Sequence, residues 1–347
     1  MDELFCFPKR KVKKINRYCK ILSTGSFLPP TVVENEEIIK MNHFPFKSGA
    51  IVKSIGVERR HVASDDNDDS DILLESARRC LMAYGISSDE LSRIIVNKLI
   101  GDNLLPMTAS RLHAKLGGKT AVHAFDIDGG ISSFIHSVDV ASRFINSGDE
   151  YILISSGGIH TKFISKTDPR VAFLFGDASA SLLFGYSPEP HILSSYLYTN
   201  HEYSKLAAMA PLSMTDNAEK LLKYGYLPQI LGSYKIENWR EVEDFLVLAT
   251  REVAKNILEE SGLCMKDIDL VLVTENNSRV WGLTLEALGV TPEKSISLIK
   301  DHGNTMSAML PLLIDFGLGS GKIQKGMRIM MISHGEGMSG GGLIYRV

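Results

Sequence analysis

The sequence is poor in the features that would assign it to several large classes of protein. No stretch approaches the roughly 18 consecutive apolar residues of a membrane span, and the N-terminus has no apolar run followed by a small-residue cleavage site. We therefore expect a cytoplasmic protein with no membrane partner. Of the 347 residues, 44% are hydrophobic and 23% are charged, a composition typical of an ordinary globular protein with a sizeable core.

Cysteine and net charge are also scarce. The four cysteines lack metal-ligand spacing, so we expect free thiols and no metal site. A net charge of -3 gives no general reason to expect nucleic acid as a partner. The run Lys9–Lys14 makes the start of the chain locally basic, and we interpret residues 1–20 as a solvated N-terminal extension.

An internal duplication is present, and it predicts the architecture. The segment 77–96 parallels 254–273: each reads as a helix closed by glycine, a short acidic loop and an apolar strand. A second pair matches Asp128–Ile131 and the helix and strand that follow with Asp301–Asn304 and its helix and strand. We therefore predict two α/β halves with parallel, doubly buried strands.

This duplication sets the predicted boundaries. They are the extension 1–20, an N-terminal half 21–185 and a C-terminal half 186–347, with a variable segment 186–240. The match places Asn304 at the position equivalent to Ile131, and it predicts that two glycine-rich helix starts face each other near the centre. Helix starts aimed at one point can form an electropositive pocket for an oxyanion or a thiolate. Alternatively, the two helices cross tightly in the core and the glycines allow close packing.

The segment Phe125–Phe134 has the strand, tight turn and buried helix start that usually present a nucleophile. Ile131 stands where that nucleophile belongs, and an alkyl side chain cannot attack a carbonyl. Successive helical positions point about 100° apart, so Ser132 and Ser133 do not replace it. We expect both serines to hydrogen-bond backbone groups at the helix start.

These motifs resemble those of the type III β-ketoacyl-acyl-carrier-protein synthases of the thiolase superfamily, from about residue 21 to the end. The motifs that carry the resemblance are Ile21–Pro30, Gly56–His61, Phe175–Ala180, His302–Thr305 and Gly335–Gly342. The resemblance implies a thiolase-like fold: two duplicated α/β halves in a five-layered αβαβα arrangement. It also implies that two catalytic positions are altered, since Ile131 stands at the family's Cys and Thr274 at its His. Asn304 matches the family's Asn.

The resemblance also implies binding roles. Gly337 belongs to the closing loop near the oxyanion site, and Asn277 and Arg279 match positions linked to pantetheine and carrier-protein contact. Ala50 and Ser54 stand where relatives carry a Trp and an Arg for the CoA nucleotide. We expect no resident cofactor, although an acyl-CoA or phosphopantetheine thioester is a candidate ligand, and acyl carrier protein is an expected partner.

Leu105 matches a bulky residue that shapes the partner's acyl tunnel in relatives, although a simple interface hydrophobe is equally compatible. We therefore expect a homodimer, or a heterodimer with a Cys-containing ketosynthase.

Two functions fit these residues. The first is a non-catalytic subunit of fatty acid or polyketide-type biosynthesis that pairs with an active ketosynthase, as chain-length factors do. The second is an atypical acyltransferase or decarboxylase that uses Asn304 and Glu275 without an acyl-enzyme. A buried Glu275 could have a raised pKa and accept a proton, or it could point away from the pocket.

Overall fold

The structure, a computed structural model, describes residues 7, 17–103, 105–119, 121–164, 166–200, 207–208, 235–236 and 239–347. The basic run Lys9–Lys14 and most of the predicted variable segment 186–240 lie outside the described residues.

The first of two central sheets has five strands in the order β1-β7-β6-β4-β5. Strand β4 is parallel to β5 and β6, whereas β7 is antiparallel to β6 and β1. The strands are β1 (Cys19–Phe27), β4 (Arg93–Lys98), β5 (His123–Asp128), β6 (Tyr151–Gly158) and β7 (Ala178–Tyr186).

The second sheet repeats this plan with four strands in the order β11-β12-β13-β8. Strands β11 and β12 are parallel, and β13 is antiparallel to both β12 and β8. A parallel bridge between Val271 and Ser295 stands where β5 stands in the first sheet. The predicted duplication is confirmed for the parallel pairs β4·β6 and β11·β12, whereas the antiparallel strands β1, β7, β8 and β13 were not predicted. The strands are β8 (Ile192–Thr199), β11 (Leu270–Val273), β12 (Arg328–Gly335) and β13 (Ser339–Arg346).

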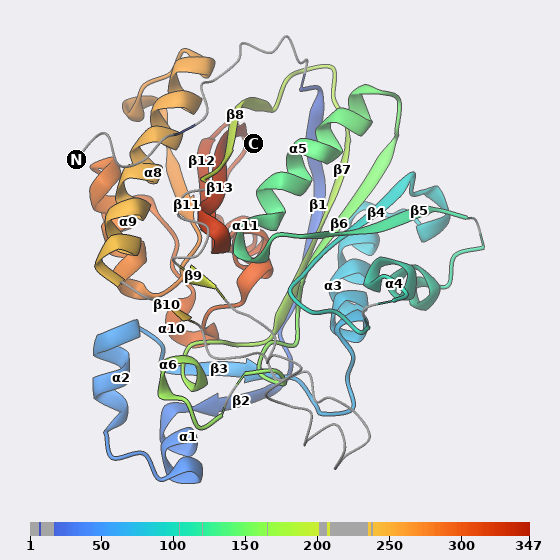
Figure 1. Cartoon of the computed structure of the whole chain (residues 1–347). Coiled ribbons are helices and arrows are strands. Elements are labelled where there is room, and N and C mark those ends of the chain that lie inside the picture. The colour runs from blue at the N-terminus through green and yellow to red at the C-terminus, as the bar shows by residue number, and fades with distance from the viewer. Residues whose placement is uncertain are drawn as a thin grey trace.

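Helices cover both sheets and fill the space between them, which gives the predicted five layers (Figure 1). Helices α3 and α4 pack on the outer face of the first sheet, α5 and α11 lie between the sheets, and α8 and α9 form the opposite outer layer. Their bounds are α3 (Asp69–Tyr84), α4 (Thr108–Leu116), α5 (Ser133–Asn146), α8 (Trp239–Ser261), α9 (Ser278–Leu288) and α11 (Met309–Gly319).

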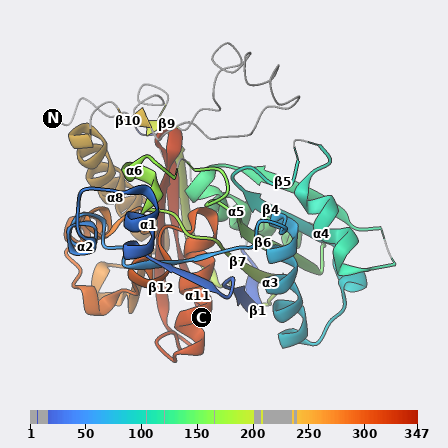
Figure 2. The ribbon, with the colours of Figure 1, turned by 90° about the horizontal axis from the view of Figure 1, so that it is seen from below.

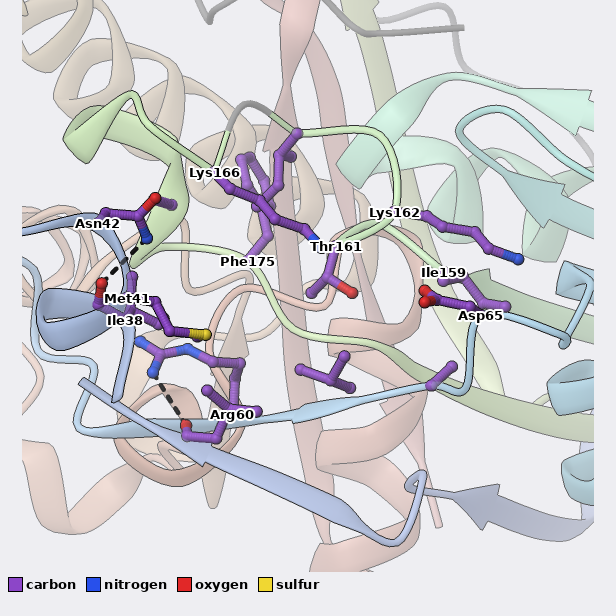
Figure 3. Close-up of a pocket in the computed structure, with 15 residues that line it drawn as sticks. Ile38, Met41, Asn42, Arg60, Asp65, Ile159, Thr161, Lys162, Lys166 and Phe175 are labelled. Carbon is purple, nitrogen blue, oxygen red and sulfur yellow. Dashed lines mark hydrogen bonds between the residues drawn. The ribbon is translucent and has the colours of Figure 1, made fainter. Parts of the chain in front are cut away.

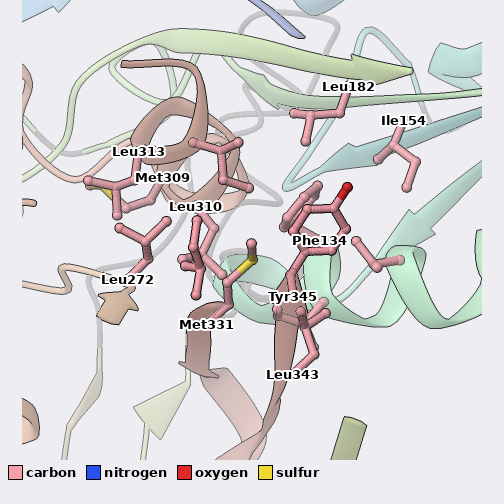
Figure 4. Close-up of a cluster of buried hydrophobic side chains, with 14 of the residues drawn as sticks. Phe134, Ile154, Leu182, Leu272, Met309, Leu310, Leu313, Met331, Leu343 and Tyr345 are labelled. Carbon is pink, nitrogen blue, oxygen red and sulfur yellow. The ribbon is translucent and has the colours of Figure 1, made fainter. Parts of the chain in front are cut away.

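The elements next to the middle of the molecule are apolar, as burial on both sides requires. In α11 every residue from Met309 to Ile314 is buried, because a sheet lies on each side of the helix. Strands β6 and β11 are buried on both faces and are accordingly continuous apolar runs over Ile152–Ile154 and Leu270–Val273. Figure 4 shows side chains of both sheets meeting α5 and α11 in the largest apolar cluster.

Smaller elements lie at the edge of these layers, as the view from below shows (Figure 2). They comprise the hairpin β2 (Thr31–Glu34) and β3 (Arg59–Val62), the pair β9 (Ala207–Ala208) and β10 (Lys235–Ile236), and the helices α1 (Asn35–Asn42), α2 (Ser48–Ile55), α6 (Pro169–Ala172) and α10 (Ile299–His302). Short 3-10 turns are η1 (Ser88–Glu90), η2 (Gly130–Ser132), η3 (Met265–Asp267), η4 (Pro292–Lys294), η5 (Met306–Ala308) and η6 (Glu336–Met338). Within the described ranges, no helix is both long and apolar enough to cross a bilayer.

Candidate functional site

The two duplicated helix starts face each other at the centre of the molecule. Turn η2 leads into α5 and turn η5 leads into α11, and the two turns are in contact. Ile131 of η2 and Met306 of η5 belong to one buried apolar cluster. The prediction that the helix starts meet is therefore confirmed.

The sequence predicted that Ile131 and Asn304 occupy equivalent positions in the two halves. In the structure the equivalent residue of the second half lies three positions later. Each turn begins with a left-handed residue, with φ of 55° at Gly130 and 51° at Met306. Superposing these two residues makes Ser307, not Asn304, the counterpart of Ile131. The ungapped sequence match missed this because the second half inserts α10 and a connecting bend before its turn.

Ile131 is enclosed by apolar side chains and is 3% exposed. It packs with Ile164, Val171, Phe175 and Met306. A side chain in this position contributes packing and offers no polar atom to the pocket.

The backbone of Ile131 is bonded on both sides by the end of β12 and the loop that follows. Its carbonyl accepts the Ser333 hydroxyl at 3.3 Å, and its N–H donates to Glu336 Oε2 at 3.4 Å. The two serines that follow Ile131 bond the backbone, as predicted. They do so by donating to the carbonyls of Gly129 and Gly130, and not by accepting helix N–H groups.

Asn304 has both functions of its side chain engaged. Its Nδ2 donates to the carbonyl of Asn276 at 3.3 Å, and its Oδ1 accepts the N–H of Met306 at 2.8 Å. Its backbone hydrogen-bonds with the backbones of Leu174 and Gly176. This one residue therefore links the segment that follows β11, the turn η5 and the segment that precedes β7. Asn304 is thus placed beside the Ile131 cluster through its neighbour Met306.

Thr274 lies at the end of β11, where its backbone N–H continues the ladder to Ile332. Its hydroxyl oxygen accepts the backbone N–H of His334 at 3.4 Å. The threonine therefore links the C-terminal ends of the neighbouring strands β11 and β12.

Glu275 is 1% exposed, and its carboxylate faces the start of α10. It accepts the N–H of Leu298 at 2.6 Å, the N–H of Ile299 at 3.1 Å and the hydroxyl of Ser297. Burial raises the pKa of Glu275 to about 7, and these three donors act in the opposite direction. The carboxyl group for which the sequence predicted proton transfer thus already accepts three hydrogen bonds within the fold.

His334, which follows Ser333 in β12, is buried and has a partner at each ring nitrogen. Its Nδ1 lies 2.8 Å from the Tyr198 hydroxyl, and its Nε2 lies 2.9 Å from Thr250 Oγ1. Complete burial lowers the pKa of His334 to about 3, so the ring is neutral at physiological pH. It is a structural histidine of the second sheet.

The predicted carrier-facing residues stand at the start of α9. Asn277 caps the helix, because its side chain accepts the N–H of Val280 at 2.9 Å. Arg279 is 65% exposed and forms a two-pronged pair with Glu243 of α8, at 2.5 Å from Nε to Oε1 and 2.9 Å from Nη2 to Oε2. Both therefore have structural partners at the molecular surface.

Leu105 and Gly337 complete the predicted site residues. Leu105 is 82% exposed and precedes Pro106 through a cis peptide bond. Gly337 lies within η6 with φ of 67°, a left-handed conformation that favours glycine, and a Cβ there would meet open space.

A cavity of about 350 Å³ adjoins the Ile131 cluster and was not foreseen from the sequence. Ile164 and Phe175 belong to both, so one apolar wall separates the helix start from the cavity. The lining comes from α1, β3 and the segments that follow β6 and precede β7, as Figure 3 shows. It is mostly apolar, with Lys162, Lys166 and Asp65 among its polar members, and can accommodate an apolar chain with a polar end.

Two family models match the sequence. The model for 3-oxoacyl-[acyl-carrier-protein] synthase III matches residues 125–201, and the model for the C-terminal part of that protein matches residues 258–347. The first match contains η2 and α5, and the second contains Glu275, Asn304 and the closing loop.

The similarity extends over nearly the whole chain. The β-ketoacyl-[acyl-carrier-protein] synthase III of Coxiella burnetii (strain Dugway 5J108-111) is 28% identical over 333 residues, which is 95% of this chain and 99% of the relative. That of Neisseria meningitidis (strain FAM18) is 28% identical over 330 residues, or 94% and 99% of the two chains. Among solved structures, 3-oxoacyl-[acyl-carrier-protein] synthase III from Aquifex aeolicus is 26% identical, with a TM-score of 0.84 over 95% of this chain and 100% of that one.

A further solved structure shares the fold at lower identity. The priming β-ketosynthase of the R1128 polyketide pathway is 23% identical, with a TM-score of 0.86 over 98% of this chain and 99% of that one.

Proposed function

Because the chain is a ketoacyl-acyl-carrier-protein synthase III-like protein with the thiolase fold, we propose that it is a non-catalytic subunit of fatty acid or polyketide biosynthesis. In this role it pairs with an active ketosynthase, as a chain-length factor does. Fold alone does not establish activity, so the proposal depends on individual residues.

The observation that carries the proposal is the side chain at position 131. Ile131 stands at the first buried turn of the central helix, at the position that the family resemblance gives to the acyl-accepting cysteine. An acyl-enzyme needs a nucleophilic sulfur or oxygen, and a branched alkyl group supplies neither. The isoleucine instead fills the space with apolar contacts to Phe175 and Met306.

Two neighbouring residues support the same conclusion. Thr274, at the position that the resemblance gives to histidine, has a hydroxyl that cannot act as a general base near neutral pH. The side chain of Asn304 bonds the backbone of Asn276 and Met306, and therefore serves the local structure. On this proposal the nucleophile is replaced by Ile131 and the base by Thr274, while the fold of the family is retained.

A non-catalytic subunit can still contribute surface and shape. Leu105 is exposed and suited to burial against a partner chain, and the cavity beside Phe175 is large enough for part of an acyl chain. We propose a dimer with a Cys-containing ketosynthase, with acyl carrier protein as the second partner. A phosphopantetheine or CoA thioester would then be a ligand of the pair.

The proposal is tested by mass spectrometry and turnover. The purified chain is incubated with acyl-CoA and malonyl-carrier protein, alone and together with a Cys-bearing ketosynthase from its host. We expect product only in the mixture, with the acyl mass solely on the Cys-bearing protein. Turnover by the isolated chain would overturn the proposal.

An atypical acyltransferase or decarboxylase is the second candidate, and the raised pKa of buried Glu275 is the observation that favours it. If Glu275 transfers a proton, Glu275→Gln abolishes turnover by the isolated chain. If the chain is a partner subunit, a folded Glu275→Gln variant leaves the activity of the mixture intact.

A further inference from the structure

The amide at the start of the central helix already has an anion beside it. The carboxylate of Glu336 accepts the N–H of Ile131, with 3.4 Å between the nitrogen and Oε2. The same oxygen would lie 2.2 Å from a Cβ built on Gly130. The carboxylate therefore rests directly on the first residues of η2, over a glycine whose missing side chain makes room for it.

The loop that carries Glu336 is fixed against this helix start on both sides of the glutamate. Before it, a Cβ on Gly335 would lie 3.1 Å from both the nitrogen and the hydroxyl oxygen of Ser132. After it, the hydroxyl of Ser339 lies 3.5 Å from that of Ser132 and donates to the carbonyl of Glu336. The position of the carboxylate thus follows from the packing of the whole loop.

The electrostatics of this contact are favourable. The backbone dipoles of η2 and α5 place partial positive charge at the helix start, where a carboxylate is stabilised. The same feature would stabilise a thiolate or the oxyanion of a reacting thioester. Once a carboxylate is present, a second anion at this position meets a like charge.

We propose that Glu336 is the resident anion of this helix start and keeps other anions from binding there. Its carboxylate occupies the place beside the Ile131 N–H where a thiolate or oxyanion would be stabilised. An enolate or a carboxylate brought to this helix start would accordingly be repelled by a like charge. This inference rests on the proposed non-catalytic function and deepens it, because the site would remain unfit for acyl transfer even with a nucleophile at position 131.

The pKa of a cysteine introduced at position 131 measures the electrostatic potential at the helix start. The pKa of this thiol is measured from the pH dependence of its alkylation by iodoacetamide, quantified on the peptide that contains residue 131. In Ile131→Cys we expect a pKa at or above the ordinary value of about 8.5, despite the helix start. In Ile131→Cys/Glu336→Gln we expect it about one unit lower, which is about tenfold more thiolate at pH 7.

Glu286 is an exposed glutamate on α9, and Ile131→Cys/Glu286→Gln should behave as the single cysteine variant does. Equal pKa values with and without Glu336 would overturn the inference. This result is independent of the proposed function, which fails only if the unsubstituted chain turns over substrate by itself.

A second measurement avoids the cysteine variants, should they fold poorly. In NMR spectra of the labelled protein, Glu336→Ala should move the amide proton of Ile131 upfield, because that proton loses a charged acceptor. Amides of the outer helix α3 should be unaffected. An unchanged Ile131 amide would show that the carboxylate is not its partner and would overturn the inference.

Discussion

The carboxylate of Glu275 accepts the backbone N–H of Leu298 at 2.6 Å, and so fastens the end of β11 to the start of α10. Ile299 and Ser297 donate to the same carboxylate. A helix start leaves N–H groups without intrahelical partners, and here a side chain from the segment that follows β11 accepts two backbone N–H groups at that start. The residue is buried, so its charge influences the stability of the fold.

Glu275 should make stability depend on pH in the range between its unfolded and folded pKa values. Burial raises the pKa to about 7 from an ordinary 4.5, so the folded chain retains a proton that the unfolded chain has released. The contribution of Glu275 to stability should therefore be highest below about pH 4.5, fall as pH rises toward 7, and level off above it. The slope is at most about 1.4 kcal/mol per pH unit.

Urea unfolding between pH 5 and pH 8 measures this contribution. In Glu275→Gln the fall with pH should be absent, while overall stability drops by about 1–3 kcal/mol because the amide presents a donor to N–H groups. Glu286→Gln serves as the exposed control. A Glu275→Gln variant with the pH profile of the unsubstituted chain would show that the carboxyl group does not titrate in this range.

Ile131 should contribute to the stability of the fold through its apolar contacts. Ile131→Ala removes buried methyl groups from a cluster closed by Phe175 and Met306, and should lower the free energy of unfolding by about 2–5 kcal/mol. Ile131→Val should cost only about 0.5–1.5 kcal/mol. Denaturant unfolding of both variants checks the ordering; an alanine variant as stable as the parent would mean that the cluster can collapse around the gap.

Substitutions of Arg279 and of its partner Glu243 can distinguish a structural role of the arginine from a role in binding a carrier protein. Its pair with Glu243 is exposed, so Arg279→Ala and Glu243→Ala should each change the stability of the fold little. If Arg279 contacts the acidic surface of a carrier protein, Arg279→Ala should weaken carrier binding in calorimetric titrations at low salt, whereas Glu243→Ala should not. Equal weakening by both variants would assign the effect to the pair and not to the arginine.

Much of this molecule is local enough to predict from its sequence. The duplication predicted two similar α/β halves because each matched segment carries its own helix end, loop and apolar strand, as in 77–96 and 254–273. The helix starts were expected to meet because both halves repeat the same turn. The predicted equivalence of the two turns was wrong by three residues, since an ungapped match cannot reveal the extra helix α10 before Met306.

The contacts that decide the site were beyond the reach of the sequence. Glu275 and Asn277 looked like groups available to a ligand, but one binds the start of α10 and the other caps α9. Glu336 lies within the motif Gly335–Gly342 but was not singled out from the sequence. Its partner Ile131 lies 205 residues away, and only packing of the two halves brings them together. Local pattern thus predicts backbones well and side-chain partners poorly.

Leu105 tests the proposed pairing. Its side chain is 82% exposed, and Met107 in the same loop is 40% exposed. Burial of a leucine against a partner contributes about 1.5–3 kcal/mol, and a carboxylate in its place would have to be desolvated. Leu105→Asp should therefore weaken self-association or pairing with a Cys-bearing ketosynthase at least about tenfold, whereas Leu105→Met should retain it.

Light scattering after size-exclusion chromatography measures the association, and circular dichroism shows whether each variant is folded. Because the side chain is almost fully exposed, Leu105→Asp should leave the thermal midpoint of the isolated chain nearly unchanged. Loss of association with an unchanged fold would place residue 105 in the interface. Unaltered association would remove Leu105 from it, and the partner role would then have to depend on another surface.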